Sequence, residues 1–334
     1  MKIHAYAANK AKGKLVPFVY DSGRLGAHDA EIEITHCGIC HSDIHLIDND
    51  WKGSRYPLVP GHEIVGTVKR LGPAVRRLAV GQRVGVGWQC GACGSCDCCV
   101  RGDENLCGRS AATCYGNHGG FADARRVDSR FAFPIPDSLD SAQAAPLLCG
   151  GITVYSPLAH YGVRPSMRVG VIGVGGLGHL ALRFARAFGC EVTAFSGSPD
   201  KEGEAMKFGA HRFVPSRDKD ALASAAGSLD FLLATVPADL DWAAYMGVLR
   251  PDGRLCFVGA IPSEVSLPVF SLIAGRKSVC GSPIGGRRTI REMLEFAARH
   301  RIGAQVETLP MARANEGVQT VRRGKPRFRI VLTN

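Results

Sequence analysis

The sequence predicts an α/β protein of two domains, one β-rich and one built on a doubly wound parallel sheet. Three observations lead to this prediction. The chain has 334 residues, which suits about two domains of ordinary size. Its first 150 residues or so carry short apolar runs among many glycines and prolines. Beyond that point, apolar runs alternate with helical segments, which is the pattern of parallel strands joined by helices.

The apolar runs in the first part of the chain have the period of strands. Residues 31–35 (EIEIT) alternate polar and apolar side chains, as a half-buried strand does. Residues 64–68 and 83–86 are also expected to be strands, and the glycines and prolines between them indicate loops. We therefore expect a β-rich domain over residues 1–152.

The second part of the chain repeats a strand–helix unit. A helix is expected at residues 180–188, and Gly189 follows as a stop signal. Strands are expected at residues 168–172, 191–195, 213–214, 231–233 and 255–258. The doubly wound domain is thus assigned to residues 153–298. Residues 299–334 become strand-like again and are expected to return to the first domain.

Composition narrows the class of protein. With 46% hydrophobic and 21% charged residues, the chain can form a full core. The first residues lack an apolar stretch of signal-peptide length, and no run reaches the roughly 18 apolar residues of a membrane span, so no membrane partner is expected. The net charge of +11 is spread along the chain as single arginines and doublets, which favours a solvated surface over a nucleic-acid partner. A zinc-loop protein that binds nucleic acid remains an alternative because of this charge.

The thirteen cysteines favour metal binding. Their number is odd, and five of them lie between Cys90 and Cys99, which argues against a disulfide framework and for a reducing cytoplasm. A C-x2-C-x2-C-x7-C spacing suits a closed, structural four-cysteine zinc site, with ligands Cys93, Cys96, Cys99 and Cys107. Cys98 lies in the same loop, and only the spacing to Cys107 favours Cys99. Redox-active thiols are the alternative.

A glycine-rich turn predicts a dinucleotide site. Residues 173–178 read GVGGLG, after an apolar strand and before an amphipathic helix. In this context glycines let the backbone approach a pyrophosphate, and the helix N-terminus offers free N–H groups. The expected cofactor contacts are Gly173, Gly175, Gly176, Leu177 and Gly178.

The end of the next strand favours NADP(H). An NAD site usually has a carboxylate there for the ribose 2′-hydroxyl. This chain reads SGSPDK over residues 196–201, so Ser196, Gly197, Ser198 and Lys201 can accept a 2′-phosphate. Asp200 comes a few residues late and is interpreted as a capping residue.

Residues 37–45 (CGICHSDIH) and 61–63 (GHE) combine thiols with imidazoles, the ligand types that zinc prefers. Ser42, with His45 three residues later, suggests a path for protons. The alternative is that Cys37 and Cys40 are core residues and His62 is a buried, hydrogen-bonded histidine.

Together with residues 147–153 (LLCGGIT), these motifs make the whole chain resemble the zinc-dependent medium-chain alcohol dehydrogenases. It is most similar to the cinnamyl-alcohol-dehydrogenase-like branch with its bacterial broad-range aldehyde reductases. The resemblance implies a GroES-like catalytic domain with two zinc sites and a Rossmann NADP-binding domain. It also implies that Cys40, His62 and Cys149 hold the catalytic zinc. Glu63 would lie close to this metal, where it would exchange with water as a ligand.

The resemblance also implies roles around that zinc. Asp43 would bond the far nitrogen of His62, a contact that fixes the histidine tautomer. Ser42 would pass a proton between the substrate oxygen and the cofactor ribose, and His45 would connect the ribose to solvent. Thr153 would touch the nicotinamide. Arg329 would meet the cofactor phosphates or brace the acidic residues near zinc.

The expected reaction is hydride transfer between NADPH and a zinc-bound aldehyde or primary alcohol. Ala112 stands where plant members carry a tryptophan, so we expect an apolar substrate pocket lined by Trp51, Trp88 and Ala112. A homodimer joined through residues 257–272 is expected from the resemblance. NAD-linked oxidation of an alcohol or polyol, and a non-catalytic NADPH-binding protein, are the competing interpretations.

Overall fold

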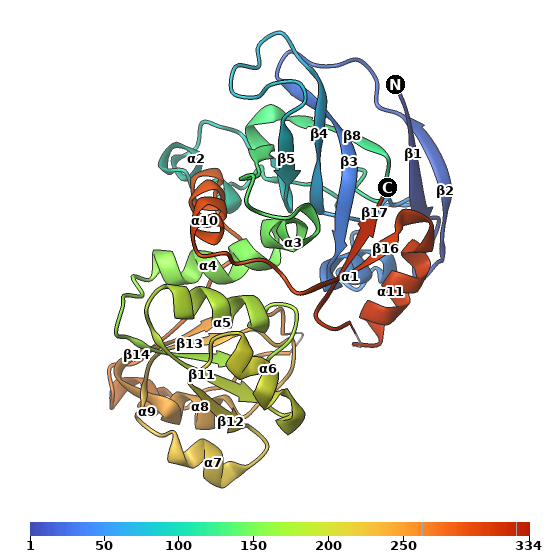
Figure 1. Cartoon of the computed structure of the whole chain (residues 1–334). Helices are drawn as coiled ribbons and strands as arrows, with labels where there is room; N and C mark the ends of the chain where they lie inside the picture. The colour runs from blue at the N-terminus through green and yellow to red at the C-terminus, as the bar shows by residue number, and fades with distance from the viewer. Residues whose placement is uncertain (262, 325) are drawn as a thin grey trace. The chain divides into compact units, whose positions relative to one another are not determined.

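The computed structural model describes residues 1–261, 263–324 and 326–334. The chain forms two compact units (Figure 1). Unit 1 comprises Met1–Ile152 and Ile284–Asn334, and unit 2 comprises Thr153–Pro283. Within the described ranges, every helix is too short or too polar to cross a membrane.

Unit 1 is organised around one large sheet. The strands of unit 1 are β1 (Lys2–Ala8), β2 (Leu15–Asp21), β3 (Asp29–Ile39), β4 (Glu63–Leu71), β5 (Arg83–Val86), β6 (Gln89–Gly91), β7 (Ala111–Ala112), β8 (Ala124–Asp128), β9 (Phe133–Pro134), β16 (Val306–Pro310) and β17 (Arg329–Thr333). The large sheet has the order β16-β17-β3-β4-β5-β9, and β8 also pairs with β3. The last strand, β17 (red in Figure 1), therefore lies beside β3 (blue).

Side-chain alternation explains β3. Ile32 and Ile34 are buried, whereas Glu33 between them is exposed, as a strand with one face on the core requires. The same core takes in Ile64 of β4 and Phe121. The helices of unit 1 are α1 (His41–Asp48), α2 (Asp97–Arg101), α3 (Ser141–Ala144), α10 (Arg287–Arg299) and α11 (Ala314–Arg322), with 3-10 turns η1 (Glu104–Leu106), η2 (Ser129–Phe131), η3 (Ala145–Leu148) and η5 (Met311–Arg313).

Unit 2 is a doubly wound parallel sheet. Its strands are β10 (Arg168–Ile172), β11 (Glu191–Ser196), β12 (Arg212–Pro215), β13 (Leu229–Ala234), β14 (Leu249–Phe257) and β15 (Ser278–Gly281). They pair in parallel in the order β12-β11-β10-β13-β14-β15. Counted within the unit, this is the 3-2-1-4-5-6 order of the Rossmann fold. The predicted parallel sheet is confirmed.

Helices cover both faces of this sheet (Figure 1). They are α5 (Gly178–Ala187), α6 (Glu202–Lys207), α7 (Lys219–Ser224), α8 (Trp242–Val248) and α9 (Val269–Ile273), with the turn η4 (Pro199–Lys201), while α4 (Gly150–His160) begins in unit 1 and continues into unit 2. β10 is buried from Val169 to Ile172 because the helices leave neither face to water. In α5, Leu180, Ala181 and Phe184 are buried on one stripe.

Residues 284–298 group with unit 1, although the alternation of elements had placed them in the cofactor domain. In α10, Met293 and Leu294 are buried, and Arg287 pairs with Glu104 of the same unit. The sequence of an amphipathic helix shows which stripe is apolar, but it does not show which sheet that stripe covers. This explains why the boundary falls earlier than expected.

Candidate metal and nucleotide sites

The first site is built on the N-terminus of α1. Cys40 is the N-cap, in extended conformation, and Asp43 occupies the third helical position. The Asp43 carboxylate accepts the backbone N–H of Cys40 at 2.9 Å, while its own N–H points back to the Cys40 carbonyl at 3.1 Å. This reciprocal capping fixes Cys40 at the helix end.

Asp43 also positions His62, which lies in the loop before β4. The second carboxylate oxygen accepts the backbone N–H of Gly61 at 2.8 Å and the Nδ1–H of His62 at 2.9 Å. A carboxylate only accepts hydrogen bonds, so the proton of the neutral imidazole resides on Nδ1 and Nε2 keeps its lone pair. His62 Nε2 is buried and has no hydrogen-bond partner among the described residues. This orphaned lone pair is what a metal ligand requires.

Four candidate ligands converge there. One ligand atom each from Cys40, His62, Glu63 and Cys149 lie within 4.8 Å of one another. The Cys40 and Cys149 sulfurs are 4.0 Å apart. Two thiolates on a tetrahedral zinc, with bonds of about 2.3 Å, would stand roughly 3.8 Å apart, whereas a disulfide would need about 2.05 Å. The donor set therefore fits zinc.

The two thiols influence one another. The hydrogen bond from Cys149 lowers the pKa of Cys40, against the effect of burial, and the nearby His62 and Arg329 lower it further. The same hydrogen bond raises the pKa of Cys149, as does burial. One thiol thus ionises first, and a bound cation would deprotonate both.

Glu63 forms a buried ion pair with Arg329 of β17. Burial raises the pKa of Glu63 to about 7, although Arg329 lowers it. The other carboxylate oxygen of Glu63 has no hydrogen-bond partner among the described residues. It faces Gly38, where any side chain would collide with it. Arg329 thus lies against an acidic residue of the ligand group; its predicted contact with cofactor phosphates remains a prediction.

Aromatic rings extend from this ligand group. Trp88 meets the His62 ring edge-on, with ring centroids 4.8 Å apart, and Trp51 meets Trp88 at 6.1 Å. Ala112 is held near Trp88 because Ala112 pairs with Gln89 and the next residue, Thr113, donates its N–H to the Trp88 carbonyl. Trp88 therefore contacts His62 directly, while Trp51 and Ala112 lie next to Trp88; the apolar substrate pocket expected from these three residues remains a prediction.

Ser42 and His45 both lie on α1, three residues apart and half-buried. Residues at this spacing lie on one side of a helix. His45 Nδ1 is 2.8 Å from Asp50 Oδ2, and its ring is 5.3 Å from that of Trp51. Thr153 lies in α4, four residues after Cys149, and is buried.

Sequence reasoning missed Cys114. Its sulfur lies 3.6 Å from His62 Nδ1 and donates to Asp43 Oδ1 at 3.7 Å. Burial raises the pKa of Cys114 to about 11, so it stays a neutral thiol on the far side of the histidine. A single cysteine outside any cluster carries no signal in the sequence that could have revealed this contact.

The second candidate metal site is the cysteine loop between β6 and β7. The sulfurs of Cys93, Cys96, Cys99 and Cys107 all lie within 4.8 Å of one another. Cys93 accepts N–H bonds from Ser95 and Cys96, which lower the pKa of Cys93 to about 5. Four sulfurs in a closed group, one of them prepared as a thiolate, fit a structural zinc ion.

Two other cysteines of the loop point elsewhere. Cys98 receives the Arg101 guanidinium at 3.8 Å, and Cys90 donates to the Ala112 carbonyl. Glu104 connects the loop to α10, because its carboxylate accepts both the Nε–H (2.6 Å) and the backbone N–H (2.9 Å) of Arg287.

The glycine loop lies between β10 and α5 in unit 2. Gly173 has φ +94°, a left-handed conformation that favours glycine. A side chain at Gly178 would collide with the Gly173 carbonyl, whereas one at Gly175 would meet open space. Gly178 therefore serves close packing of helix on strand, and Gly175 leaves the approach to the helix end free, with Gly176 and Leu177 completing the turn.

The segment after β11 lies next to this loop. Lys201 donates to the Val174 carbonyl at 2.8 Å, and the Ser198 N–H bonds the Ser196 hydroxyl at 3.2 Å. The guanidinium of Arg217, after β12, borders Gly197: a Cβ built there would lie 3.1 Å from Arg217 Nε. Sequence reasoning missed Arg217, because only the pairing of β11 with β12 brings it beside residues 196–198.

Two family models match the chain. Residues 26–137 match the model described as "Alcohol dehydrogenase GroES-like domain". Residues 176–299 match the model described as "Zinc-binding dehydrogenase". The first match covers the Cys40–Glu63 segment and the cysteine loop, and the second begins inside the glycine loop.

Whole-length relatives agree with these matches. The aldehyde reductase AdhA of a Synechocystis strain is 46% identical over 332 residues, which cover 99% of both chains. The solved structure of a cinnamyl alcohol dehydrogenase from Sorghum bicolor matches at TM-score 0.96 and 37% identity, covering 100% of this chain and 98% of that one. A structure named as CAD from Helicobacter pylori, complexed with NADP(H), matches at TM-score 0.92 and 32% identity, covering 100% and 98%.

Proposed function

The chain belongs to the zinc-dependent medium-chain alcohol dehydrogenases, and from that premise we propose that it is an NADP(H)-linked aldehyde reductase with two zinc ions per chain. Unit 1 is proposed as the catalytic domain that holds both ions, and unit 2 as the NADP-binding domain. The observation that carries the proposal is the convergence of Cys40, His62 and Cys149, with a buried His62 nitrogen that has no other partner among the described residues.

The proposed chemistry divides between the bound groups and the chain. Zinc held by Cys40, His62 and Cys149 would act as a Lewis acid toward the substrate oxygen, and the nicotinamide would supply the hydride. Asp43 keeps the His62 proton on Nδ1 and so keeps Nε2 available. Glu63, paired with Arg329, stays close as an exchangeable ligand.

Proton movement is assigned to α1. Ser42 is proposed to hold the proton that enters or leaves the substrate oxygen, and His45 to exchange it with solvent. The 2.8 Å contact with Asp50 supports this role of His45, because it orients the ring at the half-exposed side of the helix. Thr153 is proposed to contact the nicotinamide.

NADP(H) is proposed over NAD(H). Ser196, Ser198, Lys201 and Arg217 border the end of β11, where the adenosine ribose binds in Rossmann folds. Hydroxyl and cationic groups there suit a 2′-phosphate. The H. pylori structure with NADP(H) supports the same choice.

An aldehyde or primary alcohol with an apolar substituent is the proposed substrate. Trp88 lies against the His62 ring and Trp51 lies against Trp88, so both offer aromatic surface near the ligand group. A Trp88→Ala variant tested against small and aromatic aldehydes should change the order of preference; an unchanged profile would contradict this pocket.

Location and assembly are proposed from surface and thiol chemistry. All thirteen cysteines are free, which suits the reducing cytoplasm. A homodimer through residues 257–272 is supported by Val269 and Phe270, apolar side chains that α9 exposes. Residue 262 of that stretch lies outside the described residues.

The deciding experiment compares NADPH with NADH on a panel of aldehydes and alcohols, for the wild type and for Cys40→Ala. We expect faster aldehyde reduction with NADPH and loss of turnover in Cys40→Ala. Cys37→Ala is the matched control, because Cys37 is a buried core cysteine outside the ligand group. Full activity of metal-free Cys40→Ala would overturn the zinc assignment, and faster alcohol oxidation with NAD would favour the NAD-linked alternative.

A further inference from the structure

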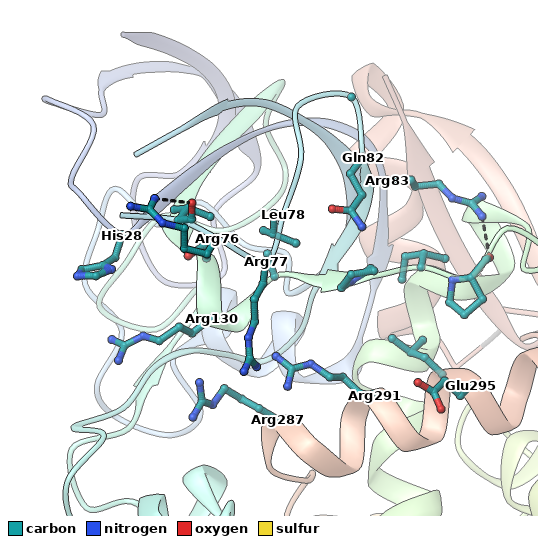
Figure 2. Close-up of a pocket in the computed structure, with 18 of the residues that line it drawn as sticks. His28, Arg76, Arg77, Leu78, Gln82, Arg83, Arg130, Arg287, Arg291 and Glu295 are labelled. Atoms are coloured by element: carbon teal, nitrogen blue, oxygen red, sulfur yellow. Dashed lines mark hydrogen bonds between the residues drawn. The ribbon is translucent and has the colours of Figure 1, made fainter. Parts of the chain in front are cut away.

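A concave site lies in unit 1, away from the two ligand groups. It has a volume of about 1190 Å³ and is enclosed by the loop at residues 74–83, the corner at residues 129–137 and the first turns of α10 (Figure 2). Six arginines contribute to its walls: Arg76, Arg77, Arg83, Arg130, Arg287 and Arg291. The lining carboxylates are Asp137 and Glu295.

In the part of the chain that the structure describes, two of the six arginines of this arginine pocket form ion pairs, and four do not. Arg130 pairs with Asp128, and Arg287 pairs with Glu104. For the other four arginines, the described ranges offer no carboxylate within ion-pairing distance. Arg83 and Arg76 use part of their donors on neutral oxygens, such as those of Pro136 and Pro73.

Three of the guanidinium groups gather at one side. In Figure 2 the Arg77 and Arg291 side chains end close together, Arg287 ends to their left, and all three ends lie away from Glu295. Arg291 packs over the Phe133 ring, with its guanidinium carbon 5.9 Å from the ring centroid. Burial lowers the pKa of Arg291, and the charges of Arg77 and Arg287 lower it further. Like charges held this close are costly unless an anion joins them.

We propose that this arginine pocket binds a small organic anion that carries at least two phosphate groups. Guanidinium groups match phosphate oxygens in a bidentate manner, and several of them favour an extended polyanion over a single phosphate. The volume slightly exceeds the roughly 300–1,000 Å³ that is usual for small-molecule pockets. Leu78, Ile135 and Leu294 give the same pocket an apolar wall, which suits an organic group attached to the phosphates.

The pocket is distinct from the sites described above. None of its lining residues belongs to the two ligand groups, and all of them lie in unit 1, whereas the glycine loop lies in unit 2. Arg287 connects the pocket to the cysteine loop through Glu104, and Arg130 borders the same loop at Gly94. The proposal therefore stands independently of the proposed reaction.

Isothermal titration calorimetry on the zinc-loaded full chain tests the proposal, with guanosine diphosphate and inorganic pyrophosphate as separate probes. We expect Arg77→Gln and Arg291→Gln each to weaken binding about tenfold, the loss expected for one charged hydrogen bond. Arg323→Gln, which removes an exposed charge elsewhere in unit 1, should leave affinity unchanged. A loss of affinity in Lys201→Ala would show that a probe binds at the glycine loop. Melting curves establish that each variant is folded.

The outcomes separate the alternatives. Tighter binding of guanosine diphosphate than of pyrophosphate would support a role for the apolar wall, and equal binding would support the phosphates alone. Unchanged affinity in both pocket variants, or loss only in Lys201→Ala, would overturn the proposal. An equal loss in Arg323→Gln would also overturn it, because overall charge would then hold the anion. Retention of duplex DNA through Arg77 and Arg291, without binding of either probe, would overturn it in favour of a nucleic-acid surface.

Discussion

Asp43 determines the geometry of the proposed catalytic zinc site more than any residue that would touch the metal. Its two oxygens accept the backbone N–H groups of Cys40 and Gly61 and the Nδ1–H of His62. The carboxylate is fully buried and also accepts from the Cys114 thiol, so these donors depend on it. One acidic side chain thereby fixes a helix end, a loop and a histidine tautomer at the same time.

Asp43→Asn should impair metal binding without changing the size of the side chain. An amide places an NH2 group either against the Cys40 N–H or against the Gly61 N–H and the His62 Nδ1–H, so at least one part of the ligand group loses its anchor. We expect zinc affinity to fall about 10–100-fold, measured by competition with a chromophoric chelator. Asp252→Asn is the control, because Asp252 forms only an exposed pair with Arg276. Equal zinc affinity in the Asp43→Asn variant and the wild type would contradict the role given to this carboxylate.

His45→Ala should slow turnover without abolishing it. General acid–base groups contribute about 10²–10⁴-fold to rates, and water can partly replace a group on a half-exposed helix. We expect a loss of kcat of roughly tenfold or more, with the rate partly restored by added imidazole. His300→Ala, at the end of α10, is the control. Wild-type kcat in His45→Ala would remove this residue from the proton path.

The sequence predicted some side chains of these sites and missed others for identifiable reasons. The spacing to Cys107 favoured Cys99 over Cys98, and the structure groups Cys99 with the other three sulfurs. Cys114 and Arg217 were missed, because each reaches its site through folding and not through a local motif.

The cysteine loop is a lobe with little hydrophobic core of its own. Within it, α2 has five residues and η1 three, and Cys99 is the one buried residue of α2. A metal would replace the missing hydrophobic contacts, because ligand binding is coupled to folding in such loops. The loop is thus expected to be the part of unit 1 most sensitive to thiol loss.

Cys107→Ser should lower bound zinc by about one ion per chain and lower the melting temperature by at least roughly 5 °C. Zinc would be counted by atomic emission and unfolding followed by calorimetry. Cys98→Ser is a closely matched control, since Cys98 lies in the same loop but outside the group of four. The reverse result, zinc lost in Cys98→Ser and kept in Cys107→Ser, would show that the wrong cysteines were chosen.

The two glycines of the dinucleotide loop should behave differently. Gly178→Ala drives a methyl group into the Gly173 carbonyl, so α5 must move from β10, and overpacking of this kind costs about 1–3 kcal/mol. Gly175→Ala meets no protein atom within 4 Å and should leave stability unchanged. Both should weaken NADPH binding, as measured by fluorescence titration, but only Gly178→Ala should melt earlier. Equal melting temperatures would contradict the packing role of Gly178.

Periodicity predicted the elements best where burial is simplest. The expected strand at residues 168–172 coincides with β10, and the expected helix at 180–188 overlaps α5. β14 begins at Leu249, six residues before the expected strand at 255, because its first half exposes Arg250 and Asp252 and so lacks an apolar run. The apolar pattern of a sequence shows which residues are buried, so it does not predict the part of a strand that is exposed to solvent.

The order of elements along the chain predicts two domains, but it does not predict to which domain every segment belongs. Helix α10 follows the Rossmann strands in sequence and yet belongs to unit 1. Its N-terminal Arg287 is held by Glu104, almost two hundred residues earlier. No local pattern contains a contact over such a distance, which is why the boundary could not be predicted.

Phe270→Glu should convert the proposed homodimer into monomers. Phe270 is 76% exposed on α9, and Val269 and Ile273 are exposed beside it. A carboxylate buried in an apolar interface would cost far more than a dimer contact gains. Sedimentation velocity measures the outcome, and Val80→Glu, at an exposed apolar position in unit 1, is the control. A monomeric wild type, or a dimeric Phe270→Glu protein, would exclude this surface.

The contacts of Asp43 have a consequence for how the protein acquires its metal. Because the carboxylate already gathers the helix end and the histidine, arrival of the ion requires little rearrangement of the polypeptide. Stripping the catalytic ion should therefore be reversible, with the apoprotein stored in a competent shape and reloaded quickly. A protein that has lost only this ion, and keeps the one in the cysteine loop, would therefore stay folded and ready to be reloaded.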